Sequence, residues 1–139
     1  QFLKENEFEG KKLIDYLGGW AKQALPLRGK KIVTYHKNWT YFVNVFGLEI
    51  VEYVEPKPGI PPSPKHVADV IQKMKENNIK VLLAANYYDS AKVKSIAERV
   101  EACPVIVALG PGGEPGMKNF FSQFDIWIGR LLEAFSQCR

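Results

Sequence analysis

The sequence lacks the features that define several classes of protein. Its 139 residues include only two cysteines and two histidines. No apolar run approaches the roughly eighteen residues of a membrane span, so we expect neither a transmembrane segment nor a signal peptide here. The GxSxG and HExxH motifs of common hydrolases are also missing. Because the chain begins with Gln1 rather than Met, we expect a processed product or an excised piece.

The charge balance is mildly basic and evenly spread. Nineteen lysines and arginines against fifteen acidic residues give a net charge of +4. The longest basic cluster is Arg28, Lys30 and Lys31, which is too small to indicate a nucleic-acid partner. A hydrophobic content of 46% and a charged content of 24% are typical of a soluble globular protein of about one domain.

Short β-branched and apolar segments alternate with segments of helical periodicity. The predicted strands are residues 31–35, 49–54, 80–85 and 104–109. The predicted helices are residues 8–24, 39–46, one after Ser63, one after Asp89, and 117–137. This alternation predicts an α/β three-layer sandwich, in which a four-stranded parallel sheet is flanked by helices and the crossovers are right-handed.

Polar residues that precede the helices, and apolar residues on one face of each, support these assignments. We expect Asn38, Ser63 and Asp89 to cap their helices, and Gly47 to end the helix at 39–46. Four stripes are expected to be buried: Leu13, Leu17, Trp20 and Ala24; Val67, Val70, Ile71 and Met74; Val93, Ile96, Ala97 and Val100; and Phe120, Phe121, Phe124, Ile128, Leu131 and Phe135.

Ligands of an open α/β sheet bind outside the carboxyl ends of its strands. His36 ends the first predicted strand, where an imidazole could act as a metal ligand or a general base, or simply lie on the surface. Glu55 ends the second strand and could ligate a metal ion or pair with Lys57 in water. We interpret His66, in the first turn of its helix, as a solvated residue. The glycine-rich loop at residues 110–116 lacks the pattern of a phosphate-binding loop.

The two cysteines are expected at the same end of the sheet. Cys103 precedes the last strand, and the last helix returns over roughly 30 Å to bring Cys138 back to that end. A disulfide would then stabilise the lobe by about 2–4 kcal/mol and would fit an extracytoplasmic location. Two free thiols are the alternative.

Two linked motifs carry a family resemblance. Residues 30–48 read KKIVTYHKNWTYFVNVFGL, and residues 55–66 read EPKPGIPPSPKH. They resemble the TYHxxWxYFxxxFGL and EPxPGIPPSPxH patterns of the metal-binding solute-binding proteins of ABC transporters, the zinc and manganese uptake group. The resemblance runs from about residue 8 to the carboxyl terminus.

The resemblance implies one lobe of a two-lobed binding protein. Residues 1–25 would end the helix that connects the lobes, and residues 26–139 would form the carboxyl-terminal lobe. Zn²⁺ or Mn²⁺ would lie in the cleft against the missing amino-terminal lobe, with His36 as a ligand and Glu55 as a weaker candidate. An ABC permease would be the partner and the periplasm or another extracytoplasmic space the location. Some members of the group are surface adhesins.

The chain departs from the family pattern at two positions. Many relatives carry an LDPLG-like segment after the fourth strand, where residues 109–113 read LGPGG and place Gly110 at the aspartate position. Relatives also often carry a glutamate after the third strand, where residues 85–87 read ANY. Glu55, Glu114 or water could replace the lost carboxylate. Few carboxylates favour zinc over manganese.

A second class of function uses the same residues. A small standalone α/β enzyme would need a second titratable group beside His36, and only Glu55 qualifies. A receiver-like domain would need acidic residues at the end of the first strand, where His36 stands instead. The binding protein is therefore the prediction, and an enzyme is not expected.

Overall fold

The computed structural model describes residues 2–57 and 59–138, and its centre is a four-stranded sheet. The strands are β3 (Lys31–Thr34), β4 (Glu49–Tyr53), β5 (Val81–Ala85) and β6 (Cys103–Val107). They pair in the order β4-β3-β5-β6, and every pairing is parallel. The three-layer α/β fold is therefore confirmed.

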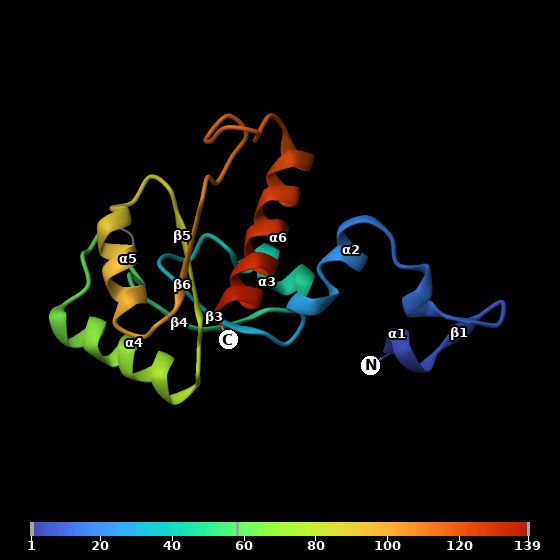
Figure 1. The fold of residues 1–139 in the computed structure, drawn as a ribbon, viewed down its shortest axis with the longest axis horizontal. Coiled ribbons are helices and arrows are strands. Elements are labelled where there is room, and N and C mark those ends of the chain that lie inside the picture. Colours follow the sequence, from blue (N-terminus) through green and yellow to red (C-terminus); the bar gives the residue numbers. More distant parts are fainter. Residues whose placement is uncertain (1, 58, 139) are drawn as a thin grey trace.

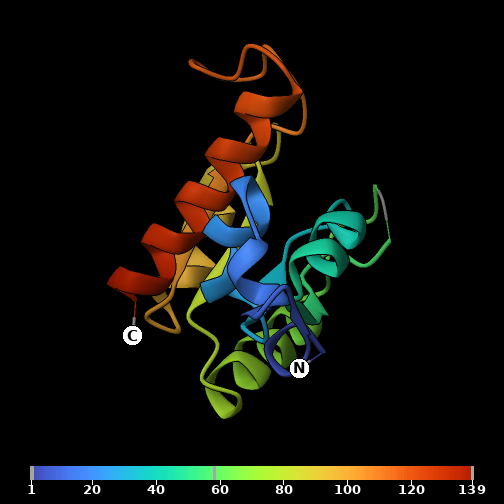
Figure 2. The same ribbon diagram turned by 90° about the vertical axis from the view of Figure 1, so that its right-hand side faces the viewer.

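Helices cover both faces of this sheet (Figures 1 and 2). One face packs against α3 (Thr40–Phe46) and α6 (Phe120–Gln137), and the other against α4 (Pro64–Glu76) and α5 (Ser90–Glu98). Along β5, which is buried throughout, Val81, Leu83 and Ala85 belong to the first core, whereas Leu82 and Ala84 belong to the second. The period of two along a strand thus divides the core into two halves.

Most predicted local signals are found in the structure. The Ser63 hydroxyl accepts the amide of His66 at 3.2 Å, and the Asp89 carboxylate accepts that of Ala91 at 3.0 Å. Gly47 ends α3 with a φ of 74°, a conformation that glycine adopts without strain. The stripes of α4 and α5 are buried as predicted, with Val67 partly covered.

The helix predicted over residues 8–24 is wrong. Residues 2–27 instead form several short elements. These are α1 (Phe2–Glu5), a hairpin of β1 (Glu7–Phe8) and β2 (Lys11–Lys12), two short 3-10 helices (Leu13–Tyr16 and Leu25–Leu27) and α2 (Gly19–Gln23). Gly10 and Gly19 have φ values of 77° and 50°, which break a continuous right-handed helix, and α2 begins only at Gly19. Each interior glycine costs a helix about 1 kcal/mol. The Leu13 side chain lies outside the described part, and the domain boundary at residues 25–26 stays a prediction.

Two smaller predictions also fail. Asn38 does not cap α3, because Trp39 stands at the cap position and the Asn38 amide bonds to Tyr87 instead. Phe120 and Phe121 are 56% and 69% exposed rather than buried. They occupy the first turn of α6, where their ring neighbours include Trp20 of α2, at centroid distances of 6.2 and 5.7 Å. The rest of the predicted α6 stripe is at least partly buried.

Candidate metal centre

His36 and Glu55 meet at the carboxyl edge of the sheet because hydrogen bonds extend the sheet beyond its assigned strands. The Tyr35 amide donates to the Leu83 carbonyl at 2.8 Å, and the Glu55 amide donates to the Tyr35 carbonyl at 2.8 Å. The buried Thr34 hydroxyl then donates to the carbonyl of His36 at 2.9 Å, which closes the turn after β3. These bonds place the residues after β3 and β4 side by side.

The side chains of the two predicted ligands are in direct polar contact. His36 Nε2 lies 3.2 Å from Glu55 Oε1, and the two side chains are 5% and 13% exposed. The interpretation of His36 as a surface residue is therefore wrong. Among the described residues, the Glu55 carboxylate contacts His36, and the alternative of a pair with Lys57 is not found.

Aromatic rings surround the imidazole. The ring of Tyr88, which follows β5, stacks on His36 with centroids 3.6 Å apart and planes 9° apart. The ring of Tyr35 lies 5.1 Å from the imidazole and 5.8 Å from Tyr88. Burial raises the pKa of Tyr35, and the nearby Glu55 carboxylate adds to this effect.

A short chain of hydrogen bonds holds Tyr88. The Asn38 amide donates to the Tyr87 hydroxyl at 3.0 Å, and that hydroxyl donates to the Tyr88 hydroxyl at 2.9 Å. Burial is the largest cause that raises the pKa of Tyr88 to about 12. The sequence predicted only a helix cap for Asn38 and no role at the site for Tyr87 and Tyr88, although the adjacent tyrosines directly after a predicted strand were a usable signal.

The metal donors in this lobe are few. Within residues 2–57 and 59–138, no group of three or more histidine, cysteine, aspartate and glutamate residues is arranged to hold a metal ion. A closed zinc site normally has four ligands, and an open one has three from the protein. His36 and Glu55 are thus two donors at one edge of the domain, fewer than a zinc site normally has.

Comparison with protein families identifies the family of the chain. The family model "Zinc-uptake complex component A periplasmic" matches residues 4–134. The chain belongs to this zinc-uptake family. Its solute-binding proteins act in transport, and the predicted family resemblance is confirmed. Comparison with the curated proteins returns no match.

Solved structures share the fold of this zinc-uptake family member at low sequence identity. It is similar to the solute-binding protein FpvC of Pseudomonas aeruginosa in complex with Mn²⁺, with a TM-score of 0.66, 21% identity, and coverage of 85% of this chain and 46% of FpvC. For ZnuA the TM-score is 0.65, with 20% identity and coverage of 83% of this chain and 42% of ZnuA. For a mutant of the laminin-binding adhesin Lmb of Streptococcus agalactiae the TM-score is 0.63, with 21% identity and coverage of 81% of this chain and 44% of Lmb. The chain spans less than half the length of these proteins.

The structure shows what the residues at the two departures from the family pattern contact. Glu114, a candidate replacement for the carboxylate missing at Gly110, is occupied elsewhere: it forms an ion pair with Arg130 and accepts the Ala108 amide at 2.7 Å. Asn86, in the segment 85–87 that stands where relatives often carry a glutamate, donates its side-chain amide to the Gly113 carbonyl at 2.9 Å. Glu55 is thus the carboxylate that the structure brings to His36.

The second histidine of this zinc-uptake family member has a structural contact. His66 is half-buried, and its Nε2 lies 2.9 Å from the carbonyl oxygen of Tyr53. The solvated residue predicted from its helix-start position is therefore wrong. His66 belongs to the β4 edge and leaves His36 as the histidine of the centre.

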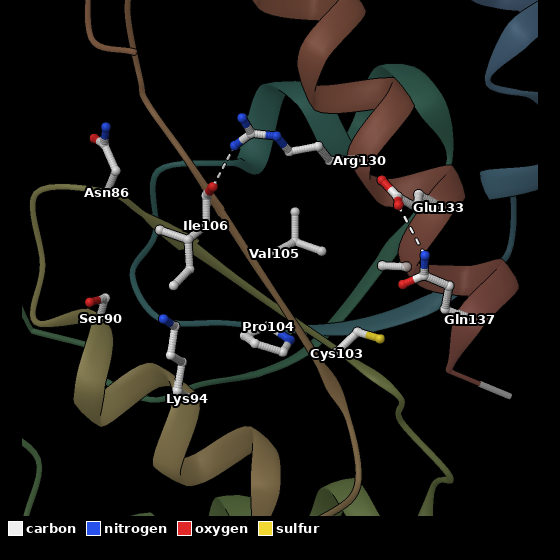
Figure 3. Close-up of a pocket in the computed structure, with 11 residues that line it drawn as sticks. Asn86, Ser90, Lys94, Cys103, Pro104, Val105, Ile106, Arg130, Glu133 and Gln137 are labelled. Atoms are coloured by element: carbon white, nitrogen blue, oxygen red, sulfur yellow. Dashed lines mark hydrogen bonds between the residues drawn. The ribbon is translucent and has the colours of Figure 1, made fainter. Parts of the chain in front are cut away.

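A hollow lies away from this centre (Figure 3). It runs along the free edge of β6 between α5 and α6, where Lys94 and Arg130 are among its lining residues. Arg130 crosses it and donates to the Ile106 carbonyl at 2.7 Å. Pro104 has no amide hydrogen to offer at this edge. Arg130 and Pro104 thus obstruct the pairing of another strand with the edge of β6. Neither His36 nor Glu55 lines the hollow.

Among the described residues, no helix has the length and apolar character needed to cross a bilayer.

Proposed function

We propose that this chain is the carboxyl-terminal lobe of an extracytoplasmic solute-binding protein that receives a divalent metal ion and delivers it to an ABC permease. The observation that carries the proposal is the 3.2 Å approach of His36 Nε2 to Glu55 Oε1 at the carboxyl edge of the sheet. In the proposed complete protein this edge faces the amino-terminal lobe across a cleft, in the periplasm or an equivalent compartment.

The separation of the two donor atoms suits a shared zinc ion. Zn²⁺ binds imidazole nitrogen and carboxylate oxygen at about 2.0–2.2 Å. At such bond lengths a donor separation of 3.2 Å corresponds to an angle at the metal of about 100°, close to the tetrahedral value. The ion therefore fits between these atoms with little movement of either side chain.

The orientation of the imidazole indicates which nitrogen binds. His36 Nδ1 is enclosed by protein atoms, whereas Nε2 faces the Glu55 carboxylate. Because a metal ligand must be unprotonated at the binding atom, the ion binds the form of His36 in which Nε2 carries no proton. The remaining ligands come from the amino-terminal lobe.

The donor types favour zinc as the cargo. FpvC, to which the chain is similar, is described in complex with Mn²⁺, and another similar protein is described as Cd-bound. One imidazole and one carboxylate in this lobe suit Zn²⁺ better than Mn²⁺, which prefers oxygen ligands. We therefore propose zinc as the first cargo to test.

No observation specifically favours the alternative of a standalone enzyme or receiver-like domain. Such a protein would use the same pair of His36 and Glu55, but the family is one of transport proteins. The proposal therefore assigns the pair to metal binding.

Zinc titration calorimetry of the chain tests the proposal. We expect weak binding, since one lobe supplies two ligands, and we expect His36→Asn to remove it. His66→Ala is the matched control because it removes the other histidine and leaves the centre intact. Tight zinc binding that survives His36→Asn would refute the assignment.

A further inference from the structure

The imidazole of His36 lacks the contact that usually orients a metal-binding histidine. Such a histidine normally donates its second ring N–H to a carboxylate, a carbonyl or water, and this bond sets the orientation of the ring. His36 Nδ1 is buried, and among residues 2–57 and 59–138 it has no hydrogen-bond partner. Besides the contact of Nε2 with Glu55, only packing can then restrain the ring.

The closest ring contact is that of Tyr88. The two rings are nearly parallel, and their centroids are only 3.6 Å apart, so the flat face of the phenol covers the imidazole. Rotation of the imidazole about its bond to Cβ would drive its edge into the phenol ring, because stacked rings at this distance are already in van der Waals contact. The stack therefore restricts the torsion angle that decides where Nε2 points.

Tyr88 is itself fixed from two directions. Its amide donates to the Ala85 carbonyl at 3.3 Å, which ties it to the end of β5. Its hydroxyl receives the hydrogen bond from Tyr87, which in turn is held by Asn38, two residues beyond His36. The network thus joins the loop after β5 to the loop that carries the histidine.

We propose that Tyr88 is a positioning residue of the metal centre: its ring, in place of a hydrogen bond at Nδ1, keeps His36 Nε2 directed at Glu55. This inference rests on the proposed function, because it assigns the stack to the same pair of ligands. Loss of an outer contact to a metal-binding histidine typically lowers metal affinity by 10- to 100-fold. We expect about a tenfold loss when the ring is removed.

Two substitutions separate the ring from the hydroxyl. Tyr88→Phe keeps the aromatic face, and Tyr88→Leu replaces it with a shorter aliphatic side chain. Zn²⁺ alone is the probe, and affinity is measured by competition with a chelating indicator. We expect Tyr88→Phe to bind within about twofold of the unmodified chain and Tyr88→Leu about tenfold more weakly. Tyr41→Leu is the matched control, since Tyr41 is 88% exposed.

A spectroscopic readout follows the ring itself. Protons above an aromatic face resonate at unusually low chemical shift, so the ring protons of His36 should be shifted upfield in the unmodified chain and in Tyr88→Phe. In Tyr88→Leu they should move downfield toward the ordinary histidine range. If Tyr88→Leu does not fold, the shifts in the other two proteins decide the question, and ordinary histidine shifts there would overturn the proposal.

The remaining outcomes distinguish this inference from the function on which it rests. Equal zinc affinity of Tyr88→Leu and the unmodified chain, with binding lost in His36→Asn, would refute the positioning role alone. A loss in Tyr88→Phe as large as that in Tyr88→Leu would also refute it, because the hydroxyl and not the ring would then be responsible. Zinc binding that His36→Asn leaves unchanged would refute the metal centre itself.

Discussion

Removal of the disulfide should destabilise the domain by several kcal/mol. Cys103 begins β6 and Cys138 directly follows α6, and the two are bonded with their Cα atoms 5.9 Å apart. The predicted pairing is thus confirmed, and no free cysteine is present among the described residues. The perturbation is the double variant Cys103→Ser, Cys138→Ser, which removes the bond and leaves two small polar side chains.

The magnitude follows from the length of the closed loop. The sequence separation is 35 residues. The chain-entropy relation gives a loss of about 13 cal/mol/K of unfolded-state entropy for such a loop, or about 3.8 kcal/mol at 25 °C. An unfolding entropy of about 2.1 cal/mol/K per residue then converts this loss into a decrease in Tm of about 13 °C for 139 residues.

Thermal unfolding followed by far-UV circular dichroism measures the effect. Reduction of the unmodified chain should reproduce the decrease seen in the double variant, and reduction of the double variant should change nothing. A decrease of less than about 3 °C in both experiments, below 1 kcal/mol by the same conversion, would refute the entropic reasoning. It would mean that packing alone holds the end of α6 against the sheet.

The remaining predictions concern the rim and its supports. Arg130→Ala should lower the free energy of unfolding by about 1–3 kcal/mol in urea denaturation, because it leaves the Glu114 carboxylate and the Ile106 carbonyl without their shared donor; an unchanged midpoint would contradict this. In an alkaline absorbance titration at 295 nm, Tyr88 should ionise near its pKa of about 12, and Tyr88→Phe should remove that step. Because the pKa of Tyr88 is raised in the folded state, its contribution to stability is complete below the unfolded value near 10 and is lost as the pH rises through 12. The segment after Glu55 contains Pro56, Pro61 and Pro62, with Pro58 outside the described residues, and should be a rigid rim. Amide relaxation at Gly59 and Ile60 should therefore resemble that of the helices, and mobility equal to that of the chain termini would count against a rigid rim.

Signals that act over a few residues were sufficient for most of the fold. The hydrophobic spacing of Val70, Ile71 and Met74 and the cap at Ser63 predict α4 correctly, because both depend only on neighbours within two turns. The alternation of strands and helices predicts the parallel sheet because a helix between two strands returns the chain to the same end of the sheet. The edge on which His36 and Glu55 lie follows from the ends of their strands.

Apolar periodicity was not sufficient in two segments. Residues 8–24 carry an apolar stripe, but glycines interrupt it and the segment forms several short elements instead. In α6 the stripe continues to Phe120 and Phe121, although the first turn of the helix leaves both residues largely exposed. Periodicity predicts which residues share a face, and only packing decides whether that face is covered.

The sequence by itself determined the α/β class, most strands and helices, and the edge where His36 and Glu55 stand, because these depend on spacing along the chain. The tertiary structure alone decided that Glu55 pairs with His36, that Glu114 pairs with Arg130, and that Tyr88 covers the imidazole. Each of these contacts joins residues from separate loops or helices. Their distances depend on how strands and helices pack against one another, and no local pattern in the sequence specifies that packing.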